Sequence, residues 1–304
     1  MKSRLLAVLT AVGVLLSLLF SLSPHLSFLS FLPSWQEIYE CFGLREERHE
    51  DKLKITVLDA GNADCIVVTA RGKTLLIDAG EVSFGDDVCR YLWNSGVKRL
   101  DYVIATHLHS DHIGGMAEVV EAFAVDRFLM TALPAYGNMD AAVWERLETA
   151  LSDRKVERTE VSAGSRFSLG AATVEFLSPQ YAATQANAQS AVCRITYGEN
   201  SFLFMGDAER GIETQLLDSG QDLHADVLKV GHHGGDTAST YDFLNAVSPL
   251  IAVIPCGEHS YYDHPSDVVL ERLATVGATV YRSDLHGRIT LLSDGTTITV
   301  KTEK

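Results

Sequence analysis

Residues 106–115 read Thr-His-Leu-His-Ser-Asp-His-Ile-Gly-Gly, and this stretch decides how the rest of the chain is interpreted. Three imidazoles and one carboxylate occur close together in it: His107, His109, His112 and Asp111. Neutral imidazole and carboxylate are the usual protein ligands of zinc and its first-row neighbours. A lone histidine is more often an ordinary surface or core residue, but four ligand-type side chains in the order HxHxDH indicate a metal site.

The sequence on either side of this stretch predicts where the four side chains lie. The run Leu-Asp-Tyr-Val-Ile-Ala at 100–105 is typical of a buried strand. Apolar residues at helical spacing follow it: Ile113, Met116, Val119, Val120 and Phe123. The ligands therefore lie on a strand-to-helix loop, where His107 and His109 could share one ion. Asp111 and His112, at the start of the helix, could turn to a second ion.

This stretch resembles the signature of the metallo-β-lactamase superfamily. The resemblance implies an αββα four-layer sandwich of the α/β (α+β) class, in which two mixed β-sheets are flanked by helices. It also implies a hydrolytic site with one or two metal ions. The alternation of strand-like and helical segments after residue 53, with hairpins at both ends, agrees with this fold.

Length and composition favour one catalytic domain behind a short leader. The chain has 304 residues, of which 46% are hydrophobic, so it can bury a large core. A formal net charge of −15 argues against a general nucleic-acid-binding protein, because phosphate contacts need clustered Lys and Arg, although it is compatible with a local basic groove. The five cysteines are scattered without a CxxC pair, which argues against a cysteine zinc site or a full disulfide framework.

The N-terminus differs from everything after it. Lys2 and Arg4 precede an uncharged apolar run at 5–21. Residues 1–33 are therefore predicted to be a signal peptide or an N-terminal membrane anchor, which places the catalytic part outside the cytoplasm, anchored to the cell membrane or secreted. An uncleaved anchor is favoured, because Pro24 follows the small-x-small site and should hinder cleavage.

The folded region is expected to begin after a polar connector at 34–52, and the hydrolase domain is expected over 53–304. Three strands of an antiparallel sheet are predicted at its start, at 53–59, 65–70 and 73–78. Asp78 ends the third strand. In the superfamily this position carries a structural aspartate beneath the metal loop, so the resemblance implies that Asp78 orients ligands.

Asp207 is the candidate ligand for both ions. Apolar strands are predicted at 190–197 and 201–205, and the second runs straight into Gly206 and Asp207. A carboxylate at the end of a buried strand, after a glycine that allows close approach, suits a ligand that bridges two ions. The alternative is that Asp207 caps a helix over 209–217.

Further histidines follow two later segments. A short apolar strand at 226–230 leads into Gly-His-His-Gly-Gly, where one imidazole should complete the second metal site while the other faces substrate. His232 is slightly favoured over His233 as the ligand. His264 precedes another predicted helix, where it could contact a phosphoryl oxygen or protonate a leaving group, or merely cap that helix.

A series of motifs narrows the family. They are DAGNAD (59–64), LLIDAG (75–80), THLHSDHIGG (106–115), SAVCRITYG (190–198), FLFMGD (202–207), DVLKVGHHGG (226–235) and DHPSDVVLERL (263–273). In this order they resemble the hydrolase domain of the ComEC family of competence DNA-uptake channels and its free-standing relatives. The resemblance covers residues 53–289 and not the channel, so it implies no transport. The usual GHHGS motif has Gly235 in place of its serine, which affects the expected substrate contacts.

The first ion site lacks one imidazole that the resemblance implies. Many superfamily enzymes supply a further histidine before the bridging aspartate, but no histidine occurs here from Ile113 to Gly206. Either another donor completes the site, with Asp64, Asn187 and Ser190 as candidates, or the ion binds more weakly. Zinc is the default ion, and manganese is the alternative because it accepts oxygen ligands.

The N-terminal run and the resemblance together predict an exported or membrane-anchored hydrolase with two divalent metal ions. The predicted metal ligands are His107, His109, Asp111, His112, Asp207 and His232. The predicted catalytic residues are Asp111, His233 and His264. The predicted supporting or substrate-contacting residues are Asp64, Asp78, Asn187 and Ser190. The ions would lower the pKa of a shared water towards ~7 and supply hydroxide at neutral pH.

This chemistry suits a phosphoester substrate, so the first hypothesis is a phosphodiesterase, with a nuclease acting on DNA as its most specific form. Two alternatives stay open. The same hydroxide could hydrolyse a lactam, a lactone or a thioester, or the chain could be a catalytically weak binding module that keeps the fold. Metal content separates the binding module from the enzymes, and no protein partner can be inferred.

Overall fold

The computed structural model describes residues 51–133, 139–181, 183, 185–258 and 263–304. The signal peptide or anchor predicted at 1–33 and most of the connector predicted at 34–52 lie outside the described residues. Within the described ranges, every helix is too short or too polar to span a lipid bilayer.

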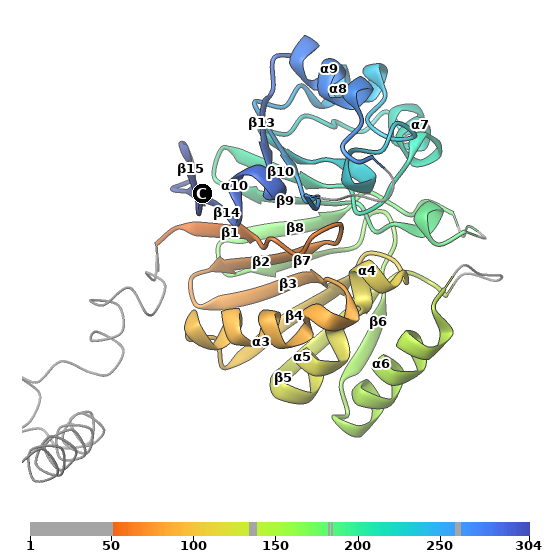
Figure 1. Cartoon of the computed structure of the whole chain (residues 1–304), viewed down its shortest axis with the longest axis vertical. Coiled ribbons are helices and arrows are strands. Elements are labelled where there is room, and N and C mark those ends of the chain that lie inside the picture. Colours follow the sequence, from red (N-terminus) through yellow and green to blue (C-terminus); the bar gives the residue numbers. More distant parts are fainter. Residues whose placement is uncertain (1–50, 134–138, 182, 184, 259–262) are drawn as a thin grey trace, which may run out of the picture. The chain divides into compact units, whose positions relative to one another are not determined.

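Two mixed β-sheets form the centre of the fold (Figure 1). The first sheet has the spatial order β15 (Ile298–Thr302), β14 (Ile289–Ser293), β1 (Leu53–Val57), β2 (Cys65–Ala70), β3 (Lys73–Ala79), β4 (Arg99–Ala105), β5 (Ala124–Met130) and β6 (Glu157–Glu160). The second has the order β13 (Thr279–Arg282), β12 (Ile251–Ile254), β11 (Val227–Lys229), β10 (Asn200–Phe204), β9 (Cys193–Tyr197), β8 (Ala172–Phe176) and β7 (Arg166–Leu169). Each sheet combines antiparallel hairpins with a parallel half, which runs from β3 to β6 in the first and from β10 to β13 in the second.

Helices cover the outer faces of the two sheets (Figure 1). On the first sheet these are α3 (Gly85–Asn94), α4 (Ser110–Ile113), α5 (Met116–Ala122) and α6 (Ala141–Asp153). On the second they are α7 (Arg210–Asp218), α8 (Tyr241–Val247) and α9 (Asp267–Thr275). The remaining short helices are η3 (Val82–Phe84), η4 (Asn187–Gln189), η5 (Gly231–Gly234) and α10 (Ser283–His286). The chain therefore has the predicted αββα architecture, with two mixed sheets flanked by helices.

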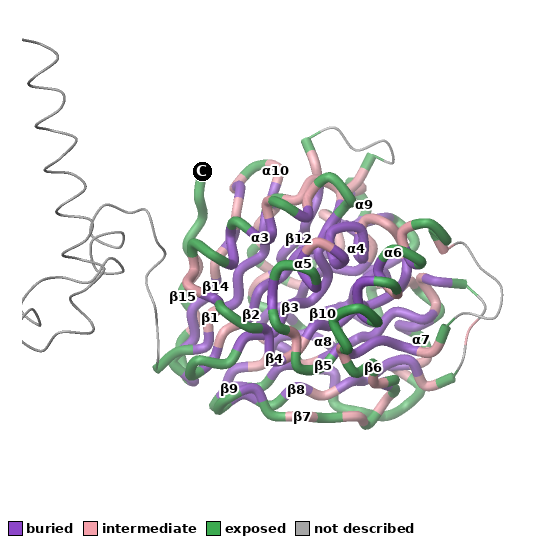
Figure 2. The backbone as a smooth tube through the Cα atoms, turned by 90° about the horizontal axis from the view of Figure 1, so that it is seen from below, coloured by how far each residue is buried: buried purple, intermediate pink, exposed green. Residues whose placement is uncertain are grey.

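Burial explains why these segments pack in layers (Figure 2). One core lies between the sheets, where side chains such as Val68 and Ile77 of the first meet Phe176 and Phe202 of the second. A second core lies between the second sheet and its helices: it includes Leu228, Ile212, Phe243 and Leu273. The central parallel strands are buried along most of their length because both faces are covered.

Several predicted boundaries shift by a few residues. The first strand ends at Val57 rather than at residue 59, and the strand predicted over 190–197 begins at Cys193. The helical spacing after the HxHxDH stretch is divided between α4 and α5, because the chain turns at Gly114 and Gly115. The consequence is a one-turn helix that holds the Asp111 and His112 side chains close to the strand end.

Candidate metal centre

Segments far apart in the chain meet at the same end of both sheets. Thr106 follows β4, Asp207 follows β10, and η5 follows β11. Because β3 and β4 are parallel, and β10 and β11 are parallel, these carboxyl-terminal ends lie at one edge. The backbone N–H of Ala191 donates to the carbonyl oxygen of Thr106 at 2.9 Å, which ties the second sheet to the metal loop of the first.

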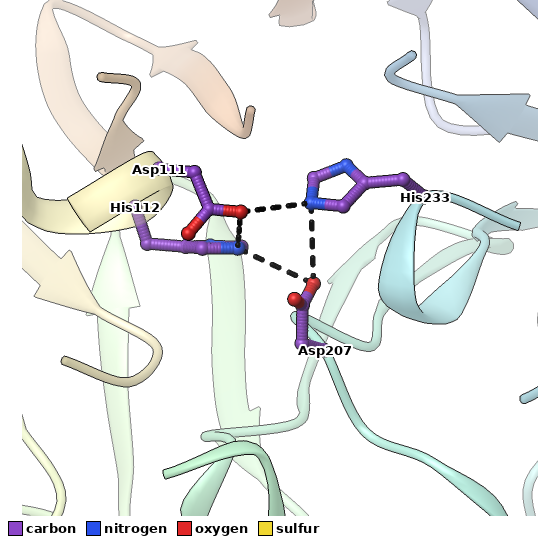
Figure 3. Close-up of side chains that lie close together, drawn as sticks. All are labelled: Asp111, His112, Asp207 and His233. Carbon is purple, nitrogen blue, oxygen red and sulfur yellow. Dashed lines mark ion pairs between the residues drawn. The ribbon is translucent and has the colours of Figure 1, made fainter. Parts of the chain in front are cut away.

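One group of ligand-type side chains consists of Asp111, His112, Asp207 and His233, and is called the Asp111 group here (Figure 3). Nε2 of His112 lies 3.3 Å from Oδ1 of Asp207, and Nε2 of His233 lies 3.6 Å from the same oxygen. The same two ring nitrogens lie 3.6 Å and 3.5 Å from Oδ2 of Asp111. Three segments, one that follows a strand of the first sheet and two that follow strands of the second, thus point four side chains at one small volume.

A second group consists of His107, His109 and Asp207, and is called the His107 group here. Nε2 of His107 lies 3.8 Å from Oδ2 of Asp207 and 3.1 Å from Nδ1 of His109. Asp207 belongs to both groups and turns one oxygen to each. This is the placement predicted for a bridging carboxylate, and helix α7 takes Glu209 rather than Asp207 as its N-cap residue.

The chemistry of these donors fits divalent metal ions. Oδ1 of Asp207, Nε2 of His112 and Nε2 of His233 are buried and have no hydrogen-bond partner among the described residues. Buried polar atoms left unpaired cost about 1–3 kcal/mol each, so their convergence is unfavourable unless a cation lies among them. Imidazole nitrogens and carboxylate oxygens are the ligand types of zinc and manganese. The residues present therefore fit an ion in the Asp111 group.

The carboxylates and imidazoles of the centre shift one another's pKa values, so a metal ion that binds here would displace protons from His112 and His233. Burial alone would raise the pKa of Asp111 and of Asp207, but His112 and the other imidazoles outweigh burial and hold both pKa values below their ordinary range. Burial would lower the pKa of His112 and His233, but the carboxylates, Asp207 foremost, raise both pKa values instead. Burial does lower the pKa of His107 well below its usual value, so this ring is neutral at pH 7, as a metal ligand must be.

Asp78 contacts the ring nitrogen of His112 that faces away from Asp207. This position suits the orienting role that the resemblance implied for Asp78. Oδ2 of Asp78 lies 2.7 Å from Nδ1 of His112, and Thr106 donates to Asp78 through both its backbone N–H and its hydroxyl. The carbonyl of Pro255 plays the same part for His233, 3.0 Å from its Nδ1. In both rings Nδ1 is engaged, so Nε2 is directed towards Asp207.

Lys229 is a member of the centre that the sequence analysis missed. Its side chain is buried in β11, forms an ion pair with the buried Asp64, donates to the carbonyl oxygen of Gly206 at 2.8 Å, and lies 4.0 Å from Oδ1 of Asp207. Asp64 is thus committed to an ion pair beside the Asp111 group and lies outside the His107 group. The lysine inside the apolar run Asp-Val-Leu-Lys-Val could have indicated a buried ion pair, because lysine is almost never buried without a partner.

The other candidate donors take supporting places. Oγ of Ser190 accepts a hydrogen bond from the backbone N–H of Asp207 at 3.2 Å, and Nδ2 of Asn187 donates to Oε1 of Glu209 at 3.4 Å. His264 does not cap α9, because Ser266 is the N-cap residue; its ring lies 5.3 Å from that of His232, centroid to centroid.

The structure places the two consecutive histidines differently from the sequence analysis, which slightly favoured His232 over His233 as the ligand. His233, not His232, joins the Asp111 group, because its Nε2 is the nitrogen that faces both Asp111 and Asp207. Nε2 of His232 lies 4.0 Å from the other oxygen of Asp207, Oδ2. The geometry therefore favours His233 as the ligand on the Asp111 side.

Comparison with known proteins agrees with this centre. Residues 58–259 match the metallo-β-lactamase superfamily. The chain is 32% identical over 243 residues to competence protein ComA of Neisseria gonorrhoeae, a match that covers 79% of this chain and 32% of ComA. It is 27% identical over 271 residues to ComE operon protein 3 of Bacillus subtilis, which covers 83% of this chain and 34% of that protein. The chain thus spans about a third of the length of these relatives.

A solved structure shows the same fold at low sequence identity. The metallo-β-lactamase-fold protein YhfI from Bacillus subtilis superposes with a TM-score of 0.51 at 14% identity, which covers 82% of this chain and 100% of YhfI. The match of residues 58–259 to the superfamily spans the HxHxDH stretch, Asp207 and both histidines of η5. The chain belongs to the metallo-β-lactamase superfamily and is related to the competence proteins of bacteria.

Proposed function

We propose that this protein is a phosphodiesterase with two divalent metal ions, and that a nuclease is its most specific form. The observation that carries the proposal is the position of Asp207, which turns Oδ1 to the Asp111 group and Oδ2 to the His107 group. A carboxylate shared in this way can hold two ions side by side. Paired ions suit in-line displacement at phosphorus, because one stabilises the attacking oxygen and the other the leaving oxygen.

The residues around the ions have distinct parts in this proposal. Zinc, or manganese as the alternative, would acidify a shared water and offset charge on the phosphoryl group. Asp78 and the carbonyl of Pro255 orient the rings of His112 and His233. Burial lowers the pKa of His264, so its ring is neutral at pH 7 and its N–H can donate to a phosphoryl oxygen.

A further observation supports a phosphate ester as the substrate. One relative of most of this chain is named a competence protein, and the GHHG and DHP motifs resemble those of the ComEC-like branch. The net charge of −15 argues against general nucleic-acid binding and leaves the ions as the main positive charge for an anionic substrate, so activity should depend on them. DNA is the polymeric substrate to test first.

The proposal includes a location outside the cytoplasm, on the membrane or secreted. Its support is the sequence of residues 1–33, with Lys2 and Arg4 before an uncharged apolar run. Protease added to intact cells or spheroplasts should degrade the catalytic part while a cytoplasmic marker stays whole. Protection equal to that of the marker would contradict this location.

The activity is tested with purified full-length protein of measured metal content. Hydrolysis of bis-(p-nitrophenyl) phosphate and of plasmid DNA should be lost with a chelator and restored by Zn²⁺ or Mn²⁺, while nitrocefin should stay intact. The His109→Ala variant should lose more than about 100-fold in kcat/KM and keep its circular dichroism spectrum, and His224→Ala, whose Nδ1 contacts the carbonyl of Val247 away from the centre, should be unaffected. Turnover of nitrocefin alone would favour the lactam alternative, and full activity of His109→Ala would contradict the assignment.

A further inference from the structure

We infer that His232 supplies the third imidazole of the His107 group, while His233 serves the Asp111 group. The His107 group contains two imidazoles and one oxygen of Asp207, and no histidine lies between Ile113 and Gly206 to complete it. A zinc site usually has three or four protein ligands. The His107 group already offers three ligands, so a third imidazole would be the fourth, and it would come from elsewhere in the fold.

The position of the His232 ring carries this assignment. Its Nε2 lies 4.0 Å from Oδ2 of Asp207, and Nε2 of His107 lies 3.8 Å from the same oxygen. Nε2 of His233 instead faces Oδ1, at 3.6 Å. The centroids of the two neighbouring rings are 6.4 Å apart. Each ring faces a different oxygen of Asp207.

The backbone of η5 explains how consecutive residues reach two sides of one carboxylate. His232 has φ +49° and His233 has φ +51°, so both lie in the left-handed region that residues other than glycine rarely adopt. Strained backbone of this kind persists where the surrounding structure demands it, and it clusters at functional sites. The backbone N–H of His232 donates to the carbonyl oxygen of Gly206 at 3.2 Å, which fixes the turn beside Asp207.

Glu209 holds the other nitrogen of the His232 ring. Oε1 of Glu209 lies 3.1 Å from Nδ1 of His232, and it also accepts from Nδ2 of Asn187 at 3.4 Å. A carboxylate on one nitrogen of an imidazole fixes the tautomer that offers the other nitrogen to a metal. Asp78 fixes the ring of His112 in this way, and the carbonyl of Pro255 does the same for His233.

The donors considered from the sequence have other contacts in the structure. Oδ2 of Asp64 pairs with Lys229, Oγ of Ser190 accepts from the backbone N–H of Asp207, and Nδ2 of Asn187 donates to Glu209. His232 also lies outside the His107 group as it stands, so its half-buried ring would have to move towards an ion beside His107 for Nε2 to coordinate it. Because this role presupposes the two-ion centre proposed above, its test must measure ion binding separately from catalysis.

The test measures how many ions the full-length protein holds and how tightly. Metal content after dialysis, competition titration with a chromophoric Zn²⁺ chelator, and the visible absorption of the Co²⁺ form are compared among variants. His232→Asn removes the imidazole but keeps a residue that tolerates the left-handed conformation. Glu209→Gln keeps the shape and removes the charge behind the ring, and His264→Ala is the matched control, since it removes an imidazole next to His232.

We expect wild-type protein and His264→Ala to hold two ions with equal affinity. His232→Asn should hold one ion tightly and bind the second at least about 10-fold more weakly, with an altered Co²⁺ spectrum, and Glu209→Gln should weaken the same ion by about 10-fold. Two ions with unchanged affinity and spectrum in His232→Asn would overturn the assignment and leave the proposed function standing. Fewer than two ions in wild-type protein would contradict the proposed two-ion function itself.

Discussion

Single side chains decide how this centre is supported, and Asp78 is the clearest case. It contacts no ion in the proposed arrangement, but it fixes His112 through a 2.7 Å contact to Nδ1 and receives two hydrogen bonds from Thr106. Its backbone is left-handed, with φ +56°, at the end of β3. Orientation by a buried carboxylate makes the ring a better ligand than an unrestrained one.

Asp78→Asn should therefore lower metal affinity and kcat/KM by about 10–100-fold, because the amide keeps the size and tolerates the backbone but no longer accepts from His112 as an anion. Metal titration and phosphodiester kinetics check this. Asp126→Asn is the control, since it breaks the exposed pair with Arg99 and should change neither quantity. Equal metal affinity in Asp78→Asn and wild type would show that Asp78 does not orient His112.

The buried ion pair between Lys229 and Asp64 is a second feature that depends on single side chains. Lys229→Met leaves the Asp64 carboxylate buried without its partner, so the free energy of unfolding should fall by about 3–5 kcal/mol. The double variant Lys229→Met/Asp64→Asn should recover much of this loss, because the uncompensated charge is gone. Urea unfolding with chelator present measures both, and a double variant no more stable than the single one would contradict a charge-pair origin.

At the scale of elements, the turn between α4 and α5 sets the position of the ligands on α4. Gly114 lies so close to η3 and to α4 itself that a Cβ there would collide with the backbone of Val82 and Ser110. Backbone atoms cannot give way as a flexible side chain can. A side chain at Gly114 would therefore displace α4 together with Asp111 and His112.

Gly114→Ala should lower the free energy of unfolding by about 1–3 kcal/mol and weaken metal binding, because the short helix must shift. Gly211→Ala in α7 is the matched control: no atom of the described part of the chain lies within 4 Å of the added Cβ, so stability should stay equal or rise by up to about 1 kcal/mol. Urea unfolding and metal titration measure the two effects. Wild-type values for Gly114→Ala in both would contradict the close packing of the turn.

At the scale of the whole domain, the centre joins the two sheets. His107 and His112 follow β4 of the first sheet, whereas Asp207 and His233 follow β10 and β11 of the second. An ion bound to both sets stabilises only the state in which the sheets are assembled. Ion binding at 100 times its dissociation constant contributes about 2.7 kcal/mol for each site.

Removing the metal should therefore lower Tm by about 5–10 °C per ion, since 1 kcal/mol corresponds to about 2–4 °C for a domain of this size. Scanning calorimetry of the full-length protein with Zn²⁺ and with chelator measures the difference. The Asp207→Asn variant, whose bridging carboxylate has lost its charge, should show a smaller difference. Identical Tm values in wild-type protein with and without chelator would contradict an ion that joins the sheets.

Much of the fold and part of the centre could be predicted from the sequence, because they depend on neighbours along the chain. The apolar run before the HxHxDH stretch, the glycine before Asp207 and the apolar spacing of the helices are local patterns. They predicted the strand-end loops and the place of Asp207 among ligand-type side chains, whereas the two mixed sheets were implied by the resemblance to the metallo-β-lactamase superfamily. The break between α4 and α5 was not predicted, since it follows from the close packing of Gly114 against η3.

The sequence alone determined which residue types carry the chemistry and that they follow buried strands, since composition and periodicity are properties of the chain itself. Only the tertiary structure decided where each side chain lies in the centre. His233 is on the Asp111 side, His232 is beside Oδ2 of Asp207, and Lys229 pairs with Asp64. The physical reason is that a left-handed backbone at two adjacent residues, and distances between strands of different sheets, set the direction of each side chain. The order and spacing of residues in the sequence specify neither this backbone conformation nor these distances.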